Sequence, residues 1–185
     1  TKLAADPVAA NGIYALGAAG TVYHSTDAGS TWSSSNTGLP SPVFLNSIAI
    51  DPKTPSTVYV GLFAATTSVH QLIYKSTNSG VSWNASGSGL PNAQGVFDLA
   101  IDPKTPSNLY ASLVVSINQN GSVIANGGVF KSVDSGGSWQ DTTAGIAPVL
   151  ATYAGTQYGN ITYTGQPLNC PASQFLITGF SLAID

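Results

Sequence analysis

The chain contains the stretch Ala-Ile-Asp-Pro-Lys-Thr-Pro-Ser twice, at residues 49–56 and again at 100–107. In both copies a tyrosine follows the Asp after eight residues, and the same spacing links Asp6 of an Asp-Pro pair to Tyr14. These three segments are termed the Asp-Pro turns. Because each copy of a repeat builds one structural unit, the repeat has to be recognised before secondary structure is assigned.

A second motif follows each Asp-Pro turn, and we name its copies the box hairpins. They read Ser-Thr-Asp-Ala-Gly-Ser-Thr-Trp at 25–32, Ser-Thr-Asn-Ser-Gly-Val-Ser-Trp at 76–83 and Ser-Val-Asp-Ser-Gly-Gly-Ser-Trp at 132–139. The Asp or Asn side chain can accept hydrogen bonds from the backbone N–H groups of a turn, and the glycine can adopt a positive φ. The motif therefore predicts a tight hairpin in each repeat.

Each repeat of about fifty residues contains four short runs that are typical of strands, bounded by Gly, Pro, Asn and Asp. No window sustains helical periodicity, so the sequence predicts an all-β fold. Four strands per repeat of this length are the size of one propeller blade. The expected strands cover residues 2–5, 12–16, 21–25, 31–33, 45–50, 57–62, 72–76, 82–85, 96–101, 108–114, 128–132 and 138–141.

The box hairpins resemble the Asp-box, Ser-x-Asp-x-Gly-x-x-Trp, of sialidase-like and related secreted β-propeller proteins, and the Asp-Pro turns are similar to those of bacterial repeat proteins of this group. The resemblance covers about residues 1–143 and again 179–185. It implies a partial β-propeller of three four-stranded blades plus the start of a fourth, in an extracellular or cell-surface protein. The expected division is blade 1 at about 1–38, blade 2 at about 45–89, blade 3 at about 96–143, an insertion at 145–178 and the start of the next blade at 179–185.

Composition excludes several classes of function. The net charge is −3 without a basic cluster, which disfavours nucleic acid as a partner. No apolar run is long enough for a membrane span. Cys170 is the single cysteine, so neither an intrachain disulfide nor a cysteine metal cluster can form, and no cofactor is expected. The chain also has no arginine, whereas the resemblance would imply an arginine triad in a sialidase and arginine-containing catalytic motifs in a xyloglucan-cleaving enzyme.

Length variation among the repeats falls on alternate connections. Nine, fifteen and twenty residues separate the second-strand and third-strand aromatics of successive repeats, whereas the Asp-Pro turns and box hairpins keep their length. Alternate turns of an up-and-down blade lie at opposite ends, so the variable connections should share one end, with the invariant turns at the other. Variable loops on a fixed scaffold often bind ligands, although loops also drift where nothing constrains them.

The candidate ligand-binding residues lie at this variable-loop end. They are polar or aromatic residues of the connections and of the insertion: His70, Gln71, Asn118, Gln119, Tyr153, Tyr158 and Tyr163. Aromatic rings with amide donors suit a carbohydrate, whose rings stack and whose hydroxyls form hydrogen bonds. The composition of the insertion is also typical of an extra packed hairpin around 160–164, which is the simpler interpretation.

Catalytic and metal-binding candidates are few. Asp98 is the only carboxylate expected at the variable-loop end of an inner strand, and a hydrogen-bonded structural role is the simpler interpretation for it. A glycosidase needs two carboxylates across a sugar. The box acids should be structural, because each hairpin offers one carboxylate or amide and the blades radiate from an axis. One carboxylate is too few for calcium, so no metal site is expected.

The sequence therefore favours a non-catalytic extracellular or cell-surface propeller module that binds a glycan or a protein partner. Two alternatives stay open: part of an extracellular glycoside hydrolase whose main catalytic residues lie outside this chain, and a structural module of a surface layer or fibre. A closed propeller needs four or more blades. Further blades are thus expected as partners, from a longer chain or from another subunit.

Overall fold

The computed structural model describes residues 2–63, 71–91, 93, 95–114, 128–144 and 182, and the backbone of the strands at 116–117 and 123–125. Twelve strands form three four-stranded antiparallel sheets, which we number as blades in chain order. Blade 1 contains β1 (Leu3–Ala5), β2 (Ile13–Leu16), β3 (Val22–Ser25) and β4 (Ser33–Ser34). Blade 2 contains β5 (Phe44–Ile50), β6 (Val58–Phe63), β7 (Ile73–Ser76) and β8 (Asn84–Ala85). Blade 3 contains β9 (Val96–Ile101), β10 (Leu109–Leu113), β13 (Gly128–Ser132) and β14 (Gln140–Asp141).

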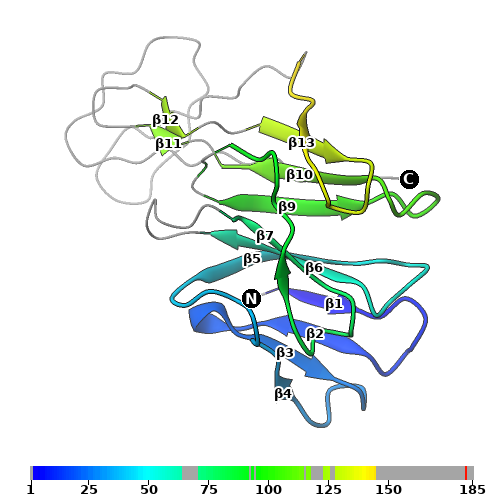
Figure 1. The fold of residues 1–185 in the computed structure, drawn as a ribbon. Coiled ribbons are helices and arrows are strands. Elements are labelled where there is room, and N and C mark those ends of the chain that lie inside the picture. The colour runs from blue at the N-terminus through cyan, green and yellow to red at the C-terminus, as the bar shows by residue number, and fades with distance from the viewer. Residues whose placement is uncertain are drawn as a thin grey trace, which may run out of the picture.

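The fold is an all-β partial propeller, as the repeat predicts. Within each blade neighbouring strands pair in chain order, and the blades themselves stack in chain order (Figure 1). Every one of the twelve expected runs overlaps an observed strand. The outermost strands β4, β8 and β14 are shorter than expected, with two residues each, because the box hairpin and its tryptophan take up the start of each run.

Two small elements were not expected from the repeat. A single turn of 3-10 helix, η1 (Ala18–Gly20), connects β2 to β3. The hairpin of β11 (Ser116–Ile117) and β12 (Val123–Ala125) extends from the connection between β10 and β13. The sequence carried a signal for this hairpin, because Asn120-Gly121 lies between two apolar runs and Asn-Gly is a favoured hairpin turn.

The hydrophobic core lies between the blades. Side chains alternate along a strand, so each blade presents one face to the preceding blade and the other to the following blade. One cluster joins blades 1 and 2 and contains Tyr14, Leu16, Val22, Val43, Val58, Val60, Leu62 and Trp83. A second cluster joins blades 2 and 3 and contains Tyr59, Leu72, Ile73, Val96, Leu99, Leu109, Ala111, Leu113, Phe130 and Trp139.

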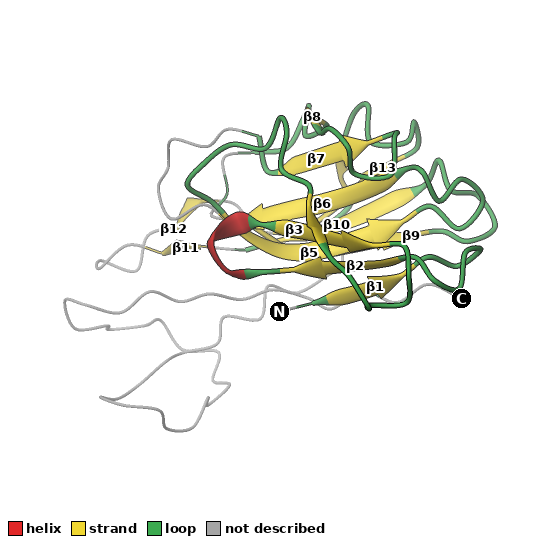
Figure 2. Cartoon of the chain, turned by 90° about the horizontal axis from the view of Figure 1, so that it is seen from below, coloured by secondary structure: helices red, strands yellow, loops and turns green. Residues whose placement is uncertain are grey.

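The Asp-Pro turns and box hairpins lie at one end of the blades, as expected, because each box hairpin is hydrogen-bonded to the Asp-Pro turn of its own blade. In blade 2 the N–H of Ser79 donates to the Ser56 carbonyl at 2.9 Å, and in blade 3 the N–H of Ser135 donates to Ser107 at 3.0 Å. The turns η1 and β11–β12 lie at the opposite end (Figure 2). The insertion at 145–178 falls outside the described residues.

Candidate functional site

One of the seven predicted ligand-binding residues, Gln71, belongs to the described part of the chain. The other six lie outside the described residues: His70, Asn118, Gln119, Tyr153, Tyr158 and Tyr163. The candidate site is therefore built outward from Gln71, which immediately precedes the buried Leu72 and the strand β7.

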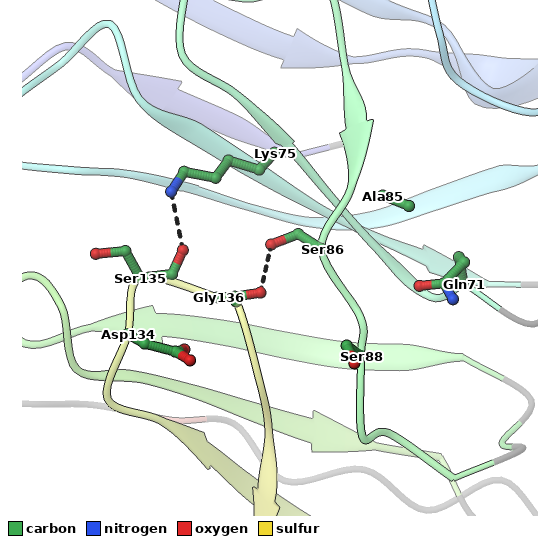
Figure 3. Close-up of a pocket in the computed structure, with 9 residues that line it drawn as sticks. Gln71, Lys75, Ala85, Ser86, Ser88, Asp134, Ser135 and Gly136 are labelled. Carbon is green, nitrogen blue, oxygen red and sulfur yellow. Dashed lines mark hydrogen bonds between the residues drawn. The ribbon is translucent and has the colours of Figure 1, made fainter.

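Gln71 lines a pocket of about 440 Å³ between blades 2 and 3. The two walls are the outer part of blade 2 and the box hairpin of blade 3. The lining residues are Gln71, Lys75, Ala85, Ser86, Ser88, Asp134, Ser135, Gly136 and Gly137. Figure 3 shows Gln71 and Asp134 toward opposite ends of this space, with Ser86 and Ser88 between them.

Two hydrogen bonds across the pocket hold its walls together (Figure 3). The Lys75 ammonium donates to the Ser135 carbonyl at 2.9 Å, and the Ser86 hydroxyl donates to the Gly136 carbonyl at 2.7 Å. The Tyr59 hydroxyl donates to the same Ser135 carbonyl at 2.9 Å. Burial raises the pKa of Tyr59 to about 12, so this hydroxyl keeps its proton and remains a donor across the physiological range.

The Lys75 side chain is also held from within blade 2. Its ammonium lies 5.3 Å from the centroid of the Tyr59 ring, a distance at which a cation and an aromatic ring attract each other. Burial lowers the pKa of Lys75, while the charges of Asp51 and Asp134 oppose this shift. Lys75 thus fixes the geometry of the pocket, and the amide of Gln71 and the exposed hydroxyl of Ser88 add neutral donors and acceptors to its lining.

The Asp134 carboxylate binds its own hairpin. It accepts hydrogen bonds from the Ser132 hydroxyl at 2.7 Å, the Ser138 N–H at 2.8 Å and the Ser138 hydroxyl at 2.6 Å. The Ser138 hydroxyl is the main cause that lowers the pKa of Asp134 to about 2. Asp27 makes the equivalent bonds in blade 1, and its pKa is also lowered to about 2, chiefly by the Thr31 hydroxyl. These contacts support a structural role for the box acids.

The hairpin of blade 2 carries Asn78 where the others carry Asp. Its side-chain oxygen accepts from the Ser76 hydroxyl at 2.8 Å and from the Ser82 N–H at 2.9 Å, and its amide donates to the Ser82 hydroxyl at 2.9 Å. An amide can therefore make the same three contacts as the carboxylate, because the serine hydroxyl can act as donor or acceptor.

This equivalence predicts how acid affects the fold. The folded pKa of Asp134 is below the ordinary value of 3.8, so its carboxylate stabilises the fold above pH 4, and this stabilisation is lost as the pH falls from about 4 to about 2. We expect Asp134→Asn to leave stability near pH 7 almost unchanged and to reduce its fall between pH 4 and pH 2. Asn78→Asp should steepen that fall. Urea denaturation midpoints measured from pH 2 to 7 test both variants, and parallel curves for the three proteins would contradict this assignment.

The predicted candidate Asp98 lies on the inner strand β9. Its carboxylate forms an ion pair with Lys2 at 3.2 Å and accepts the backbone N–H of Leu182 at 3.1 Å. Lys2 precedes the inner strand of blade 1, so this ion pair links blades 1 and 3. The carboxylates of the Asp-Pro turns, of the box hairpins and of Asp141 also accept hydrogen bonds. Their donors are nearby backbone N–H or hydroxyl groups.

The inner strands border a second, apolar space of about 460 Å³. It is lined by alanines, isoleucines, leucine and the prolines of the Asp-Pro turns: Ala4, Ala5, Pro7, Ile48, Ala49, Ile50, Pro52, Leu99, Ile101 and Pro103. None of these described lining residues is acidic. Among the described residues no three His, Cys, Asp or Glu side chains form a group that could hold a metal ion. No helix in the described part of the chain is long and apolar enough to cross a membrane.

The inter-blade pocket was not predicted as a site. Lys75 was not among the candidate residues, and Asp134 was expected only as a structural acid of its hairpin. The available signal was the recurrence of polar residues at the positions of Lys75 and Ser86 in every repeat, namely His24, Lys131, Ser35 and Thr142. That recurrence shows where blades meet, and it gives no indication of a space between them.

Comparison with known proteins identifies the fold. Neither protein-family models nor curated sequences match the chain. Its structure is similar to that of an ancestral GH74 enzyme, with a TM-score of 0.60 and 18% identity over 81% of this chain and 19% of the enzyme. It is also similar to the GH74 xyloglucanase from Xanthomonas campestris, with a TM-score of 0.54 and 17% identity over 80% of this chain and 24% of the enzyme. Both are β-propeller proteins, and the chain spans about a fifth to a quarter of their lengths.

Proposed function

We propose that the chain is a non-catalytic β-propeller module, extracellular or on a cell surface, that binds a glycan or a protein partner at its variable-loop end. The observation that carries this proposal is the position of Gln71, which follows a variable connection and lies at one end of a polar pocket that extends from there to the box hairpin of blade 3 (Figure 3). The other candidates, His70, Asn118, Gln119, Tyr153, Tyr158 and Tyr163, belong to the same proposal. The blade boundaries expected from the sequence are part of the same proposal, and so is the relation to Asp-box proteins.

The chemistry of the pocket favours a glycan as the first ligand to test. A sugar hydroxyl both donates and accepts hydrogen bonds, and the Gln71 amide and the Ser88 hydroxyl can do the same. Lys75 and Ser86 already bind carbonyl groups of blade 3, and Asp134 already binds Ser132 and Ser138. A neutral, hydroxyl-rich ligand could occupy this space without breaking the contacts between blades.

The experiment is a screen of the 185-residue chain on an array of plant and microbial glycans, followed by calorimetric titration of the strongest ligand. We expect Gln71→Ala to weaken binding about three- to tenfold, the effect of one hydrogen bond. Gln140→Ala removes the same amide from the exposed strand β14 and should leave the affinity unchanged. Equal affinities for both variants would place the binding site elsewhere, and a blank array would exclude the glycan.

A second candidate function is suggested by the position of Asp98 on an inner strand, together with the propeller fold that the chain shares with the GH74 enzymes. The chain would then be part of a glycoside hydrolase whose main catalytic residues lie in other blades. Incubation of xyloglucan with a protein that contains this chain together with the further blades distinguishes the two. Release of sugars by that protein that Asp98→Asn abolishes would favour the hydrolase, whereas bound and unaltered polysaccharide favours the binding module.

A further inference from the structure

Near the start of the third strand of each blade, one backbone N–H group faces the outer strand. In blade 1 this residue is Val22, whose N–H donates to the side-chain oxygen of Asn36 at 2.9 Å. In blade 3 it is Val129, whose N–H donates to the hydroxyl of Thr143 at 3.1 Å. Asn36 and Thr143 occupy the same position of the repeat, four residues after the box tryptophan. Two of the blades therefore use a side chain to bind this N–H.

Blade 2 lacks such a side chain, because the same position of its repeat is Gly87. The corresponding donor is the N–H of Ile73, a residue with 0% of its surface exposed. Within the described part of the chain, neither a backbone carbonyl nor a side chain accepts a hydrogen bond from the Ile73 N–H. A buried N–H without an acceptor is rare in folded proteins and destabilises them, so its occurrence here requires an explanation.

The backbone around Gly87 has the same hydrogen bonds as in blade 1. The Ser86 N–H donates to the Ile73 carbonyl at 2.8 Å, and the Leu90 N–H donates to the Gly87 carbonyl at 3.2 Å. The bonds at the corresponding places of blade 1 have lengths of 2.8 and 3.0 Å. A side chain at position 87 would therefore start from the same place, relative to the third strand, as that of Asn36.

The place of the absent side chain lies beside the pocket between blades 2 and 3. An added Cβ at Gly87 would lie 3.1 Å from the Oε1 atom of Gln71, and its next two neighbours would lie at 3.4 and 3.5 Å. Gly87 is flanked by Ser86 and Ser88, which line the pocket together with Gln71. We name this place the Gly87 socket and define it by Gln71, Ile73 and Gly87.

The Gln71 side chain closes the socket. Gln71 is half-buried, whereas Ile73 and Gly87 beneath it are buried. The Gln71 carboxamide makes no hydrogen bond with a described residue, so no bond to that part of the chain holds it over the socket. Changes of side-chain rotamer are common where a ligand binds. In the other two repeats the position of Gln71 is a glycine, Gly20 or Gly127, so this combination of side chains is particular to blade 2.

We propose that the Gly87 socket binds the acetamido group of an N-acetylated sugar, whose carbonyl oxygen accepts the Ile73 N–H. This inference rests on the proposed function, and it names the chemical class of the glycan. A backbone N–H can only donate, so the group that enters must present an acceptor. In blade 1 the carbonyl oxygen of a carboxamide, that of Asn36, accepts the equivalent N–H.

The length of the acetamido group also fits the socket. Its carbonyl oxygen is separated from the sugar ring by the same number of bonds as the Asn36 oxygen is from its Cα. A sugar hydroxyl is bonded directly to the ring, so it is too short to pass Gln71 and reach the Ile73 N–H. The acetamido group therefore replaces the side chain that Gly87 lacks.

Gln71 supplies the second partner of the acetamido group. When its carboxamide turns toward the pocket, its Oε1 atom can accept the N–H of the acetamido group. The exposed hydroxyl of Ser88 remains for the hydroxyls of the sugar ring. Gln71 lies at one end of the pocket, apart from Lys75 and its bond to blade 3 (Figure 3), so a ligand in the socket leaves this contact between the blades intact.

The test compares two trisaccharides that differ in this group alone. Tri-N-acetylchitotriose and cellotriose have the same β-1,4-linked backbone, and only the first carries an acetamido group on each ring. In calorimetric titrations of the 185-residue chain, we expect chitotriose to bind at least about tenfold more tightly, the effect of one or two hydrogen bonds. Gly87→Asn should lower the affinity for chitotriose to that for cellotriose, because its carboxamide would occupy the socket and accept the Ile73 N–H.

Stability measurements separate a filled socket from a damaged fold. Gly87→Asn should raise the urea denaturation midpoint, because it supplies the missing acceptor, whereas most substitutions lower the stability of a fold. Gly87→Ala is the matched control, since it adds a Cβ without an acceptor, and its midpoint should lie below that of Gly87→Asn. Gly87→Thr, which copies the residue found in blade 3, replaces Gly87→Asn if that variant does not fold.

Three results would overturn this inference. They are a chitotriose affinity no higher than that for cellotriose, a folded Gly87→Asn protein that keeps the preference for chitotriose, or a Gly87→Asn protein that is no more stable than Gly87→Ala. If chitotriose fails while a glycan without acetamido groups binds on the array, this inference is wrong and the proposed binding function stands. A blank array would contradict both the socket and the proposed glycan.

Discussion

Replacing Trp139 with alanine is expected to lower the free energy of unfolding by about 3–5 kcal/mol, the usual cost of removing a large buried aromatic side chain. Trp139 is 3% exposed and belongs to the core cluster between blades 2 and 3. Its removal leaves a cavity between the blades and deprives the Ser86 carbonyl of its 2.7 Å hydrogen bond. The measurement is urea denaturation followed by circular dichroism.

Two variants separate the causes of this loss. Trp139→Phe keeps an aromatic ring and removes the N–H, so it should cost about 1–3 kcal/mol. Trp32→Ala removes the same residue from the same place in the repeat, but Trp32 is 42% exposed and bonds to its own hairpin. We expect Trp32→Ala to cost about 1 kcal/mol at most. Equal losses of stability for Trp139→Ala and Trp32→Ala would show that the contact between blades does not add to the stability of the fold.

Replacing Gly38 with alanine is expected to cost about 2–5 kcal/mol, although only one methyl group is added. Gly38 has a φ of +92°, and its added Cβ would lie 2.1 Å from the Trp83 carbonyl oxygen of blade 2. The left-handed backbone costs a non-glycine residue about 1–2 kcal/mol. Relieving the contact with a backbone atom of another blade should add about 1–3 kcal/mol, as overpacking does elsewhere.

Gly29 provides the control for Gly38. Its φ of +88° is almost the same, but its added Cβ would meet only the Trp32 ring, at 3.6 Å. Gly29→Ala should therefore cost about 1–2 kcal/mol, from backbone strain alone. Thermal or urea denaturation gives the stability of each alanine variant. The difference between the two stabilities is the cost of placing a Cβ where blade 1 closely approaches blade 2. A Gly38→Ala protein as stable as the Gly29→Ala protein would contradict that approach.

Much of the fold could be predicted from local sequence. The spacing from each Asp-Pro turn to its tyrosine, and from each box hairpin to its tryptophan, is set by bonds within one blade, such as those of Asp51 to the N–H groups of Lys53 and Thr54. Such contacts leave a pattern in the chain because their partners are a few residues apart. Strand order within each blade followed from the same repeats.

The site was harder to predict because its residues come from different blades. Lys75 and Ser135 are sixty residues apart in sequence, and their hydrogen bond depends on how blade 3 packs against blade 2. The ion pair between Lys2 and Asp98 depends in the same way on the packing of three inner strands. Neither contact follows from the local pattern of one repeat, and only Gln71 was identified in advance as a residue of the site.

The hydrogen bonds between box hairpins and Asp-Pro turns lie at one end of the blades, while the connections that differ in length leave from the other end. Residues can therefore be inserted after Phe63 or after Leu113 without breaking a bond between a box hairpin and the Asp-Pro turn of its blade. Substitutions far apart with no shared partners usually act additively. A lineage with this architecture can change the length and sequence of these loops with little effect on folding, and a foreign peptide grafted at either position should be tolerated for the same reason.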